Sequence, residues 1–222
     1  MLQATTIQFI TNLATNNNKP WFDANRKHYE AAKADFNAFI QQIINGLAQQ
    51  EPALSTLQVK DCTFRINRDV RFSANKDPYK TNMGAGFSLG GKKLTTAGYY
   101  LHIQPGASFV AGGLYMPEGN QLAQIRQEVD YNFAAFQAIV SAKAFTKTYK
   151  TLQVENGMQL VRPPKGYEAS NPAIHYLRLK SFVATIAIPN EQLSSKTLVA
   201  KVLQHFATAQ PLVSFLNTAI AV

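Results

Sequence analysis

The segment from Met83 to Met116 reads MGAGFSLGGKKLTTAGYYLHIQPGASFVAGGLYM, and it decides the fold. Three runs within it, at 83–89, 94–104 and 107–116, are separated by a Gly-Gly pair and a Pro-Gly pair, which are typical of turns. Connections this short join neighbouring antiparallel strands, because a parallel crossover needs a dozen or more residues. The segment therefore predicts an antiparallel sheet in the middle of the chain.

Further strands are expected on both sides of this segment. Apolar and polar residues alternate at Leu57 and Val59 and, after a break, from Cys62 to Ile66, as in a half-buried strand. Residues 152–161 predict a hairpin, because Asn156-Gly157 accepts the positive φ angles of a tight type I′ turn. With an apolar run at 182–188, the predicted sheet comprises about residues 57–116, 152–161 and 182–188.

Helices are expected around the sheet. An apolar residue every three or four positions predicts one helix that begins at Thr5 or Thr6 and a long one from about Asp23. The same spacing predicts further helices at 118–142, at 171–178, and in two C-terminal segments separated by Pro211. Helices that flank a sheet without regular alternation with its strands indicate the α+β class. We expect residues 1–222 to form a single domain.

The composition is typical of a globular protein with a basic surface. Of the 222 residues, 46% are hydrophobic and 16% are charged, and the formal net charge is +9. Residues 60–102 carry eight Lys or Arg against three Asp, and residues 162–180 carry four against one Glu. Such a charge favours polyanions, phosphorylated metabolites or acidic surfaces as partners.

Cysteine usage and hydropathy indicate the cellular compartment. Cys62 is the only cysteine, so the chain forms no internal disulfide and no cysteine-based zinc site. The N-terminal segment does not resemble a signal peptide, and no segment approaches the roughly 18 apolar residues that span a bilayer. We therefore expect a cytoplasmic protein that does not enter a membrane.

Two short motifs match known signatures but lack their structural context. Residues 86–90 fit the G-x-S-x-G pattern of a serine nucleophile, and residues 86–92 fit part of a phosphate-binding loop. Both signatures require a helix after the loop, whereas another strand is expected here. The four histidines show no pair spaced to hold a metal locally. The sequence therefore predicts neither a metal site nor a cofactor.

Charged residues gather in RINRDVRFSANKDPYKTN, which runs from Arg65 to Asn82. In a flat strand, Arg68 would share a face with apolar Ile66 and Val70, and a buried guanidinium needs an anionic partner. The lysines that follow lie on an Asn-Lys-Asp-Pro turn, which can present donors to an anion. This segment is either a binding site or a purely structural network of salt bridges.

We interpret the segment as part of a basic cleft that binds an anionic small molecule carrying phosphate or carboxylate. The expected ligand-binding residues are Arg65, Arg68, Arg71, Lys76, Tyr79, Lys80, Tyr115, Arg162 and Lys165. A metal-independent enzyme is the first alternative, with Asp69 or His102 exchanging protons while arginines stabilise negative charge. Nucleic-acid binding ranks lower, because the sequence contains no recognisable DNA- or RNA-binding motif.

The spacing Arg65-x-x-Arg68-Asp69-x-Arg71-Phe72-x-x-x-Asn75-Lys76-x-x-Tyr79 resembles the signature of an uncharacterised family of bacterial and fungal proteins, domain of unknown function 2461. The resemblance extends over the whole chain. Its other landmarks are matched by residues 16–22, 100–103, 112–117, 162–167 and 177–182. Membership of this family implies no particular activity.

Overall fold

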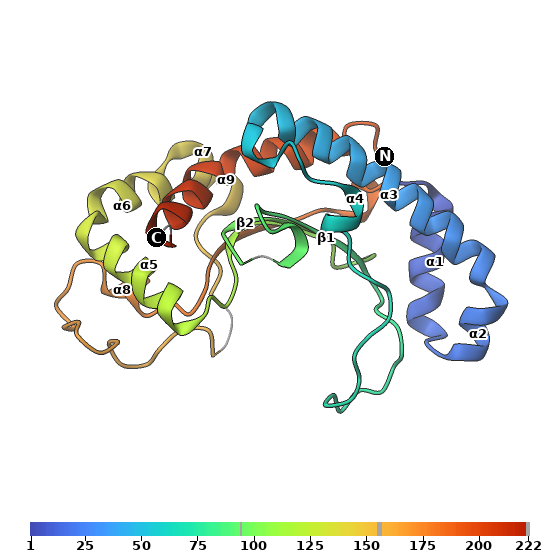
Figure 1. Cartoon of the computed structure of the whole chain (residues 1–222), viewed down its shortest axis with the longest axis horizontal. Helices are drawn as coiled ribbons and strands as arrows, with labels where there is room; N and C mark the ends of the chain where they lie inside the picture. The colour runs from blue at the N-terminus through green and yellow to red at the C-terminus, as the bar shows by residue number, and fades with distance from the viewer. Residues whose placement is uncertain (94, 155–156, 221–222) are drawn as a thin grey trace.

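The computed structural model describes residues 1–93, 95–154 and 157–220, in which helices surround a four-stranded antiparallel sheet (Figure 1). The predicted α+β class is confirmed. The helices are α1 (Ala4–Thr15), α2 (Lys19–Ala24), α3 (Arg26–Gln50), α4 (Val59–Cys62), α5 (Gly119–Tyr131), α6 (Phe133–Ser141), α7 (Lys143–Tyr149), α8 (Ile174–Leu177) and α9 (Leu198–Ile220). The strands are β1 (Met83–Phe87), β2 (Gly98–Ile103), β3 (Phe109–Leu114) and β4 (Phe182–Ala187). Short 3-10 turns lie at η1 (Pro52–Leu54), η2 (Gly91–Lys93) and η3 (Asn190–Gln192).

The strands follow one another across the sheet in the order β1-β2-β3-β4. The three strands predicted between residues 83 and 116 and the strand predicted at 182–188 are all present. In the register, Gly84 pairs with His102, and Ala111 lies between Tyr100 and Thr185. Because successive side chains of a strand point to opposite faces, these five residues share one face of the sheet.

The other face, which we call the inner face, packs against α9, and α3 packs against α9 in turn (Figure 1). The ring of Tyr99 stacks on Phe206 of α9, with 4.7 Å between the ring centroids, and Val110 is fully buried. Gly112 lets α9 approach closely, because a Cβ atom there would overlap the Cβ atom of Ala209. The main core of the protein therefore lies between the sheet and α9.

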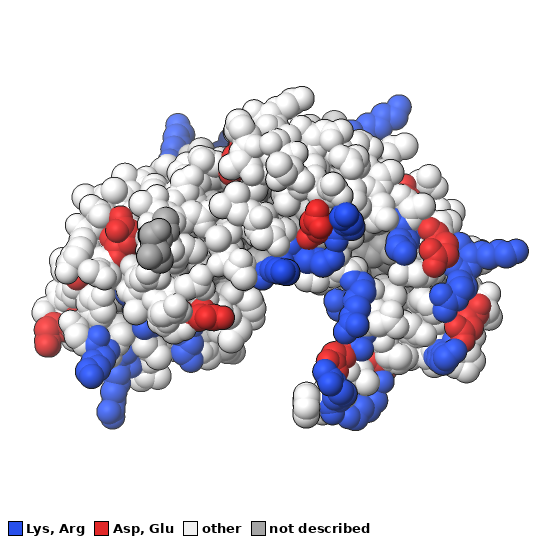
Figure 2. Space-filling view, viewed as in Figure 1, with Lys and Arg blue, Asp and Glu red and all other residues white. Residues whose placement is uncertain are grey.

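The face away from α9, which we call the open face, has helices only at its two ends. In Figure 1, α5, α6 and α8 lie at the left end of the molecule, α1 and α2 lie at the right end, and the segment 63–82 projects downward in the right half. Figure 2 shows a hollow between the left end and this segment. The open face is formed by Gly84, Gly86, Gly98, Tyr100, His102, Phe109, Ala111, Gly113, Val183, Thr185 and Ala187.

The prediction of a strand at 57–66 is wrong. Residues Val59–Cys62 form α4, and Thr63 makes only an isolated bridge with Ala85 of β1. The apolar residues Val59 and Cys62 are three positions apart, which suits one face of a helical turn. A few alternating residues therefore did not distinguish a strand from a single helical turn followed by an extended segment.

The predicted hairpin at 152–161 is also absent from the residues that the structure describes. Asn156, one of its two turn residues, lies outside the described ranges. The N–H of Gln153 donates instead to the carbonyl of Val183, and Gln159 forms an isolated bridge with Leu179. Backbone groups in and near β4 thus provide hydrogen-bond partners for both sides of the expected hairpin.

The helix boundaries differ from the prediction at three points. Asn25 separates α2 from α3, and Asn132 divides the region expected at 118–142 into α5 and α6. The expected break at Pro211 is wrong, because α9 runs through it as one helix of 23 residues. Phe206 and Leu212 are fully buried on the two sides of this proline, so apolar burial offsets its cost of about 3 kcal/mol.

None of the helices within residues 1–93, 95–154 and 157–220 combines the length and the apolar character needed to cross a bilayer.

Candidate functional site

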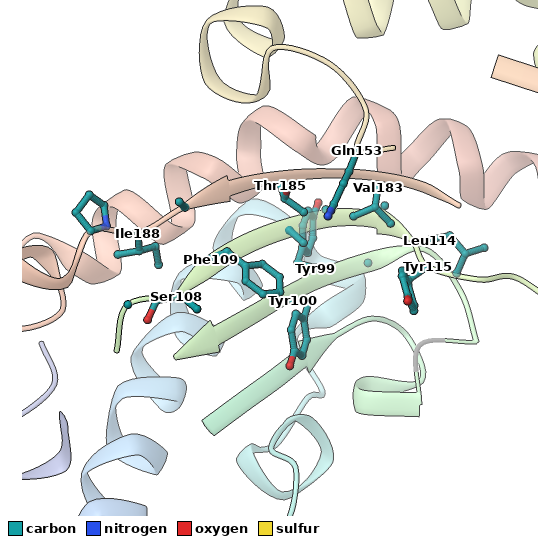
Figure 3. Close-up of a pocket in the computed structure, with 18 of the residues that line it drawn as sticks. Tyr99, Tyr100, Ser108, Phe109, Leu114, Tyr115, Gln153, Val183, Thr185 and Ile188 are labelled. Carbon is teal, nitrogen blue, oxygen red and sulfur yellow. The ribbon is translucent and has the colours of Figure 1, made fainter. Parts of the chain in front are cut away.

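A cavity of about 820 Å³ lies against the open face of the sheet (Figure 3). Its lining comes from β2, β3 and β4, from the neighbouring segments 106–108 and 188–190, and from Tyr115 and Gln153. Small-molecule sites in proteins have volumes of about 300–1,000 Å³. This cavity, which we call the sheet cavity, is therefore large enough for a ligand of ordinary metabolite size.

The floor of the sheet cavity consists largely of residues with little or no side chain. Gly98 and Gly113 pair across β2 and β3, and Ala111 lies opposite Thr185 of β4. At Gly98 and Gly113 even a Cβ atom would overlap backbone, the carbonyl oxygen of Phe87 and that of Phe182, whereas a larger side chain at Ala111 would point into the cavity. The hydroxyl of Thr185 makes no hydrogen bond within the part of the chain that the structure describes. The floor thus offers a flat apolar surface with one polar group.

A hydrogen-bonded row of polar side chains follows β2 along this face. Nε2 of His102 lies 2.9 Å from Oε1 of Gln104, and Nδ1 of His102 lies 3.2 Å from the hydroxyl of Tyr100. Because an amide oxygen only accepts hydrogen bonds, Nε2 carries the proton and Nδ1 accepts from Tyr100. Asn82 also donates to Nδ1, at 3.4 Å. Burial lowers the pKa of His102, which favours the neutral imidazole.

Aromatic rings connect this row to a cation at the edge of the sheet. Phe109 stacks on His102, and the ring of Tyr100 meets that of Phe64 with 6.1 Å between centroids. Nζ of Lys80 lies 5.3 Å from the centroid of Phe64. Burial and the positive charge of Arg65 lower the pKa of Lys80. Two cations therefore lie close together at this edge.

A second pocket, of about 290 Å³, lies between α3 and the segment 63–66. Its lining includes four cations, Lys33, Lys60, Arg65 and Lys92, and contains no aspartate or glutamate. We call it the basic pocket. Figure 2 shows that Lys and Arg side chains gather along the right-hand wall of the hollow.

The cations of the basic pocket differ in their partners. Nζ of Lys92 donates to the carbonyl oxygens of Lys60 at 2.6 Å and Thr63 at 3.0 Å, so the backbone around α4 fixes its position. Lys33 lies 3.9 Å from the carboxylate of Glu30, in an exposed pair on α3. Arg65 makes no hydrogen bond or ion pair with any residue in the described ranges. Its guanidinium donors therefore remain open to a ligand.

Arg68 has neutral partners, so the expectation of an anionic partner for it is not met. The side chain is half-buried, and it donates to the carbonyl oxygen of Asp77 at 3.1 Å and to the hydroxyl of Ser73 at 3.3 Å. Nζ of Lys76 similarly donates to the carbonyl oxygen of Val70 at 3.1 Å. The segment curls back on itself, and both cations hold that loop together.

Asp69 and Arg71 pair with one another on the exposed part of this loop. The guanidinium of Arg71 donates to both carboxylate oxygens of Asp69, at 2.7 and 3.0 Å. These hydrogen bonds lower the pKa of Asp69. A carboxylate with a lowered pKa is a weak base, which makes Asp69 poorly suited to proton exchange at neutral pH. Of the two catalytic candidates, only His102 lies on the open face.

Tyr79 lies in the core. Its side chain is 6% exposed, and its ring stacks on Phe22 with 4.0 Å between centroids and 15° between planes. The backbone of Tyr79 is held by Asn17, whose side-chain amide donates to the carbonyl of Tyr79 and accepts from its N–H. The ring therefore supports the base of the 65–82 loop from inside the protein.

The remaining expected residues lie elsewhere around the hollow. Tyr115 lines one margin of the sheet cavity and is 56% exposed. Arg162 and Lys165 are exposed in the connection between α7 and α8, at the end of the molecule opposite the 65–82 loop (Figure 1). The structure thus brings Arg65 and Lys80 together but does not gather all the expected cations in one cleft.

Sequence reasoning missed the three lysines of the basic pocket and the role of Tyr100. Lys33, Lys60 and Lys92 are about thirty residues apart in sequence, and each has ordinary polar neighbours. No local pattern could have joined them, because the fold alone brings α3, α4 and η2 together. Tyr100 had a signal, since it shares a strand face with His102 two residues later.

Metal ligands do not cluster within residues 1–93, 95–154 and 157–220. No three His, Cys, Asp or Glu side chains there lie close enough together to hold an ion. Both ring nitrogens of His102 already have hydrogen-bond partners. The groups available to a ligand are therefore the cations of the basic pocket and the hydroxyls and rings of the sheet cavity.

Comparison with known proteins extends the resemblance seen in the sequence. No curated protein and no solved structure matches the chain. The sequence model of a family described as conserved hypothetical protein (DUF2461) matches residues 5–215. This range includes every residue that lines the sheet cavity and the basic pocket. The chain therefore belongs to the DUF2461 family of conserved hypothetical proteins.

Proposed function

We propose that this protein binds an anionic small molecule and that the basic pocket holds the anionic group. The observation that carries the proposal is the lining of this pocket, which has four cations and no carboxylate. Cations gathered in a partly enclosed site repel one another unless an anion lies between them. A phosphate or carboxylate group would provide that anion.

Arg65 is the residue on which binding depends most. A guanidinium presents several donors in a rigid fork that matches the oxygens of phosphate and carboxylate. Since Arg65 has no competing partner within the described residues, an anion need not break an existing ion pair. Burial and the charge of Arg65 lower the pKa of Lys80, and an anion near Arg65 would offset the second of these effects. Lys92, held by two carbonyl groups, adds a charge whose position is fixed before binding.

A thermal-unfolding titration with inorganic phosphate tests the proposal. A ligand that binds only the folded state raises the unfolding temperature by mass action. We expect phosphate to raise this temperature for the wild-type protein and for Arg71→Ala, but not for Arg65→Ala. Arg71 is a matched control, because it is an arginine of the same segment that already pairs with Asp69. Sodium chloride at matched ionic strength corrects for general screening.

Two results would count against a small-molecule site. Equal stabilisation of wild type and Arg65→Ala by phosphate would remove the basic pocket from consideration. Binding of single-stranded RNA that weakens steeply with salt, without any response to phosphate, would favour a nucleic-acid partner, because polyanion binding releases many counterions.

A further inference from the structure

We infer that the ligand is a planar ring bearing an anionic group, with the ring in the sheet cavity and the anionic group in the basic pocket. The identity of the anionic end rests on the function proposed above. Different residues, those of the open face, favour a planar ring as the other part of the ligand.

One pair of residues joins the linings of the two pockets, and a second pair joins the basic pocket to the open face. Phe64 lines the basic pocket, and its ring meets that of Tyr100, which lines the sheet cavity. Asn82 also lines the basic pocket, and it donates to Nδ1 of His102 on the open face. A molecule that extends past Phe64 and Tyr100 would contact both pockets. Charge complementarity therefore orients it, with its negative end toward Arg65.

The shape of the sheet cavity favours a flat apolar group. Gly98, Gly113 and Ala111 add little or no side chain to the middle of the open face. The rings of Tyr100 and Phe109 project from the neighbouring positions (Figure 3). A planar ring can lie flat on such a floor and bury one whole side against it, which a branched or globular group cannot do. Removal of this apolar surface from water provides the driving force.

Two hydroxyl groups can form hydrogen bonds with polar groups at the edge of that ring. The hydroxyl of Tyr100 donates to His102, so its oxygen remains able to accept a hydrogen bond from an N–H or O–H of the ligand. The hydroxyl of Thr185 makes no hydrogen bond within the described ranges and can donate to a ring heteroatom or a carbonyl. A planar ring with polar edge groups and an anionic substituent is chemistry shared by nucleotides and aromatic acids.

Calorimetric titration with paired probes tests the inference. We expect phenyl phosphate to bind wild type at least tenfold more tightly than inorganic phosphate, because only phenyl phosphate has a ring. The variant Ala111→Leu should reduce its affinity to that of phosphate, since the larger side chain fills the floor. Ala138→Leu adds the same bulk on an exposed position of α6 and should keep the tenfold difference. Adenosine monophosphate and benzoate then distinguish a nucleotide from an aromatic acid.

Each outcome separates the inference from the function on which it rests. If phosphate binds through Arg65 but phenyl phosphate binds no more tightly, the ring site is wrong and the anion site stands. If neither probe binds wild type, the ring site and the anion site are both wrong. A tenfold preference that survives in Ala111→Leu also overturns the inference. Should that variant fold poorly, Ala187→Leu, at an exposed position of the same floor, provides the same test.

Discussion

The hydroxyl of Tyr100 lies 3.2 Å from Nδ1 of His102 on the open face of the sheet, and it donates a hydrogen bond to that nitrogen. Protonation of Nδ1 would convert it to a donor, so the hydroxyl of Tyr100 would have to accept instead and the amide of Asn82 would lose its acceptor. The neutral imidazole is thus the form that suits the folded protein. Phe109 stacks on the same ring at 4.8 Å and keeps it in place.

We expect the unfolding free energy to fall as the pH is lowered below about 6.5, and to fall less steeply in His102→Gln. Burial lowers the pKa of His102 in the folded state, so the unfolded chain takes up a proton first. The contribution of His102 to the free energy of unfolding is therefore complete above its pKa in the unfolded chain, and it is lost as the pH falls toward its pKa in the folded protein. Urea unfolding at several pH values measures it.

His205→Gln is the control for this experiment. Burial and the charge of Lys201 also lower the pKa of His205, so its replacement should remove a separate part of the slope. Identical slopes for wild type and His102→Gln would show that His102 does not titrate differently in the two states.

Tyr79→Ala should lower the free energy of unfolding by about 3–5 kcal/mol, as large-to-small changes of core aromatics do. Tyr79→Phe should change it by less than about 1 kcal/mol, because the stacked ring and its contact with Phe22 are kept. Chemical denaturation of both variants measures the difference. A large loss in Tyr79→Phe would instead assign the hydroxyl a role of its own.

Gly112→Ala should destabilise the protein by about 1–3 kcal/mol, the usual cost of overpacking, because the new Cβ atom overlaps Ala209 of α9. The second change Ala209→Gly should recover part of this loss, although a glycine within a helix costs about 1 kcal/mol itself. A double variant no more stable than Gly112→Ala would show that overlap between positions 112 and 209 is not the cause of the lost stability.

Arg68→Ala should loosen the 65–82 loop rather than unfold the core. The change removes two hydrogen bonds, worth about 1 kcal/mol each, from a half-buried side chain. We expect faster trypsin cleavage after Arg71 or Lys76, with a small loss of global stability. Arg65→Ala, which removes no such bond within the described residues, serves as the comparison. Equal cleavage rates would mean that Arg68 does not hold the loop.

The central sheet could be predicted because its signals are local. Glycine and proline mark the turns, and Tyr100 and His102 alternate with the buried Tyr99 and Leu101 along one strand. The long helix α3 was equally clear, since a regular apolar stripe over many turns has no other interpretation. Segments 57–66 and 152–161 were less clear, because a run of so few residues is compatible with more than one secondary structure.

The candidate site was only partly accessible to sequence reasoning. Arg65 and Lys80 stood out in a charged segment, but nothing in that segment distinguished them from Arg71, which pairs with its own neighbour. Tyr79 looked like a ligand contact because lysines surround it, whereas its ring stacks on Phe22, 57 positions earlier in the sequence. Such contacts depend on tertiary packing, which no pattern of adjacent residues encodes.

Because β4 and α9 come later in the sequence than β3, they emerge from the ribosome after it. Both elements pack against β3, and Phe206 of α9 covers Tyr99 and Phe87 of the inner face. A nascent chain that has emerged only as far as residue 181 therefore exposes these apolar rings and the unpaired edge of β3. Exposed apolar surface and open strand edges promote aggregation. We expect the sheet to complete its folding only after release of α9, and chaperones to protect the chain until then.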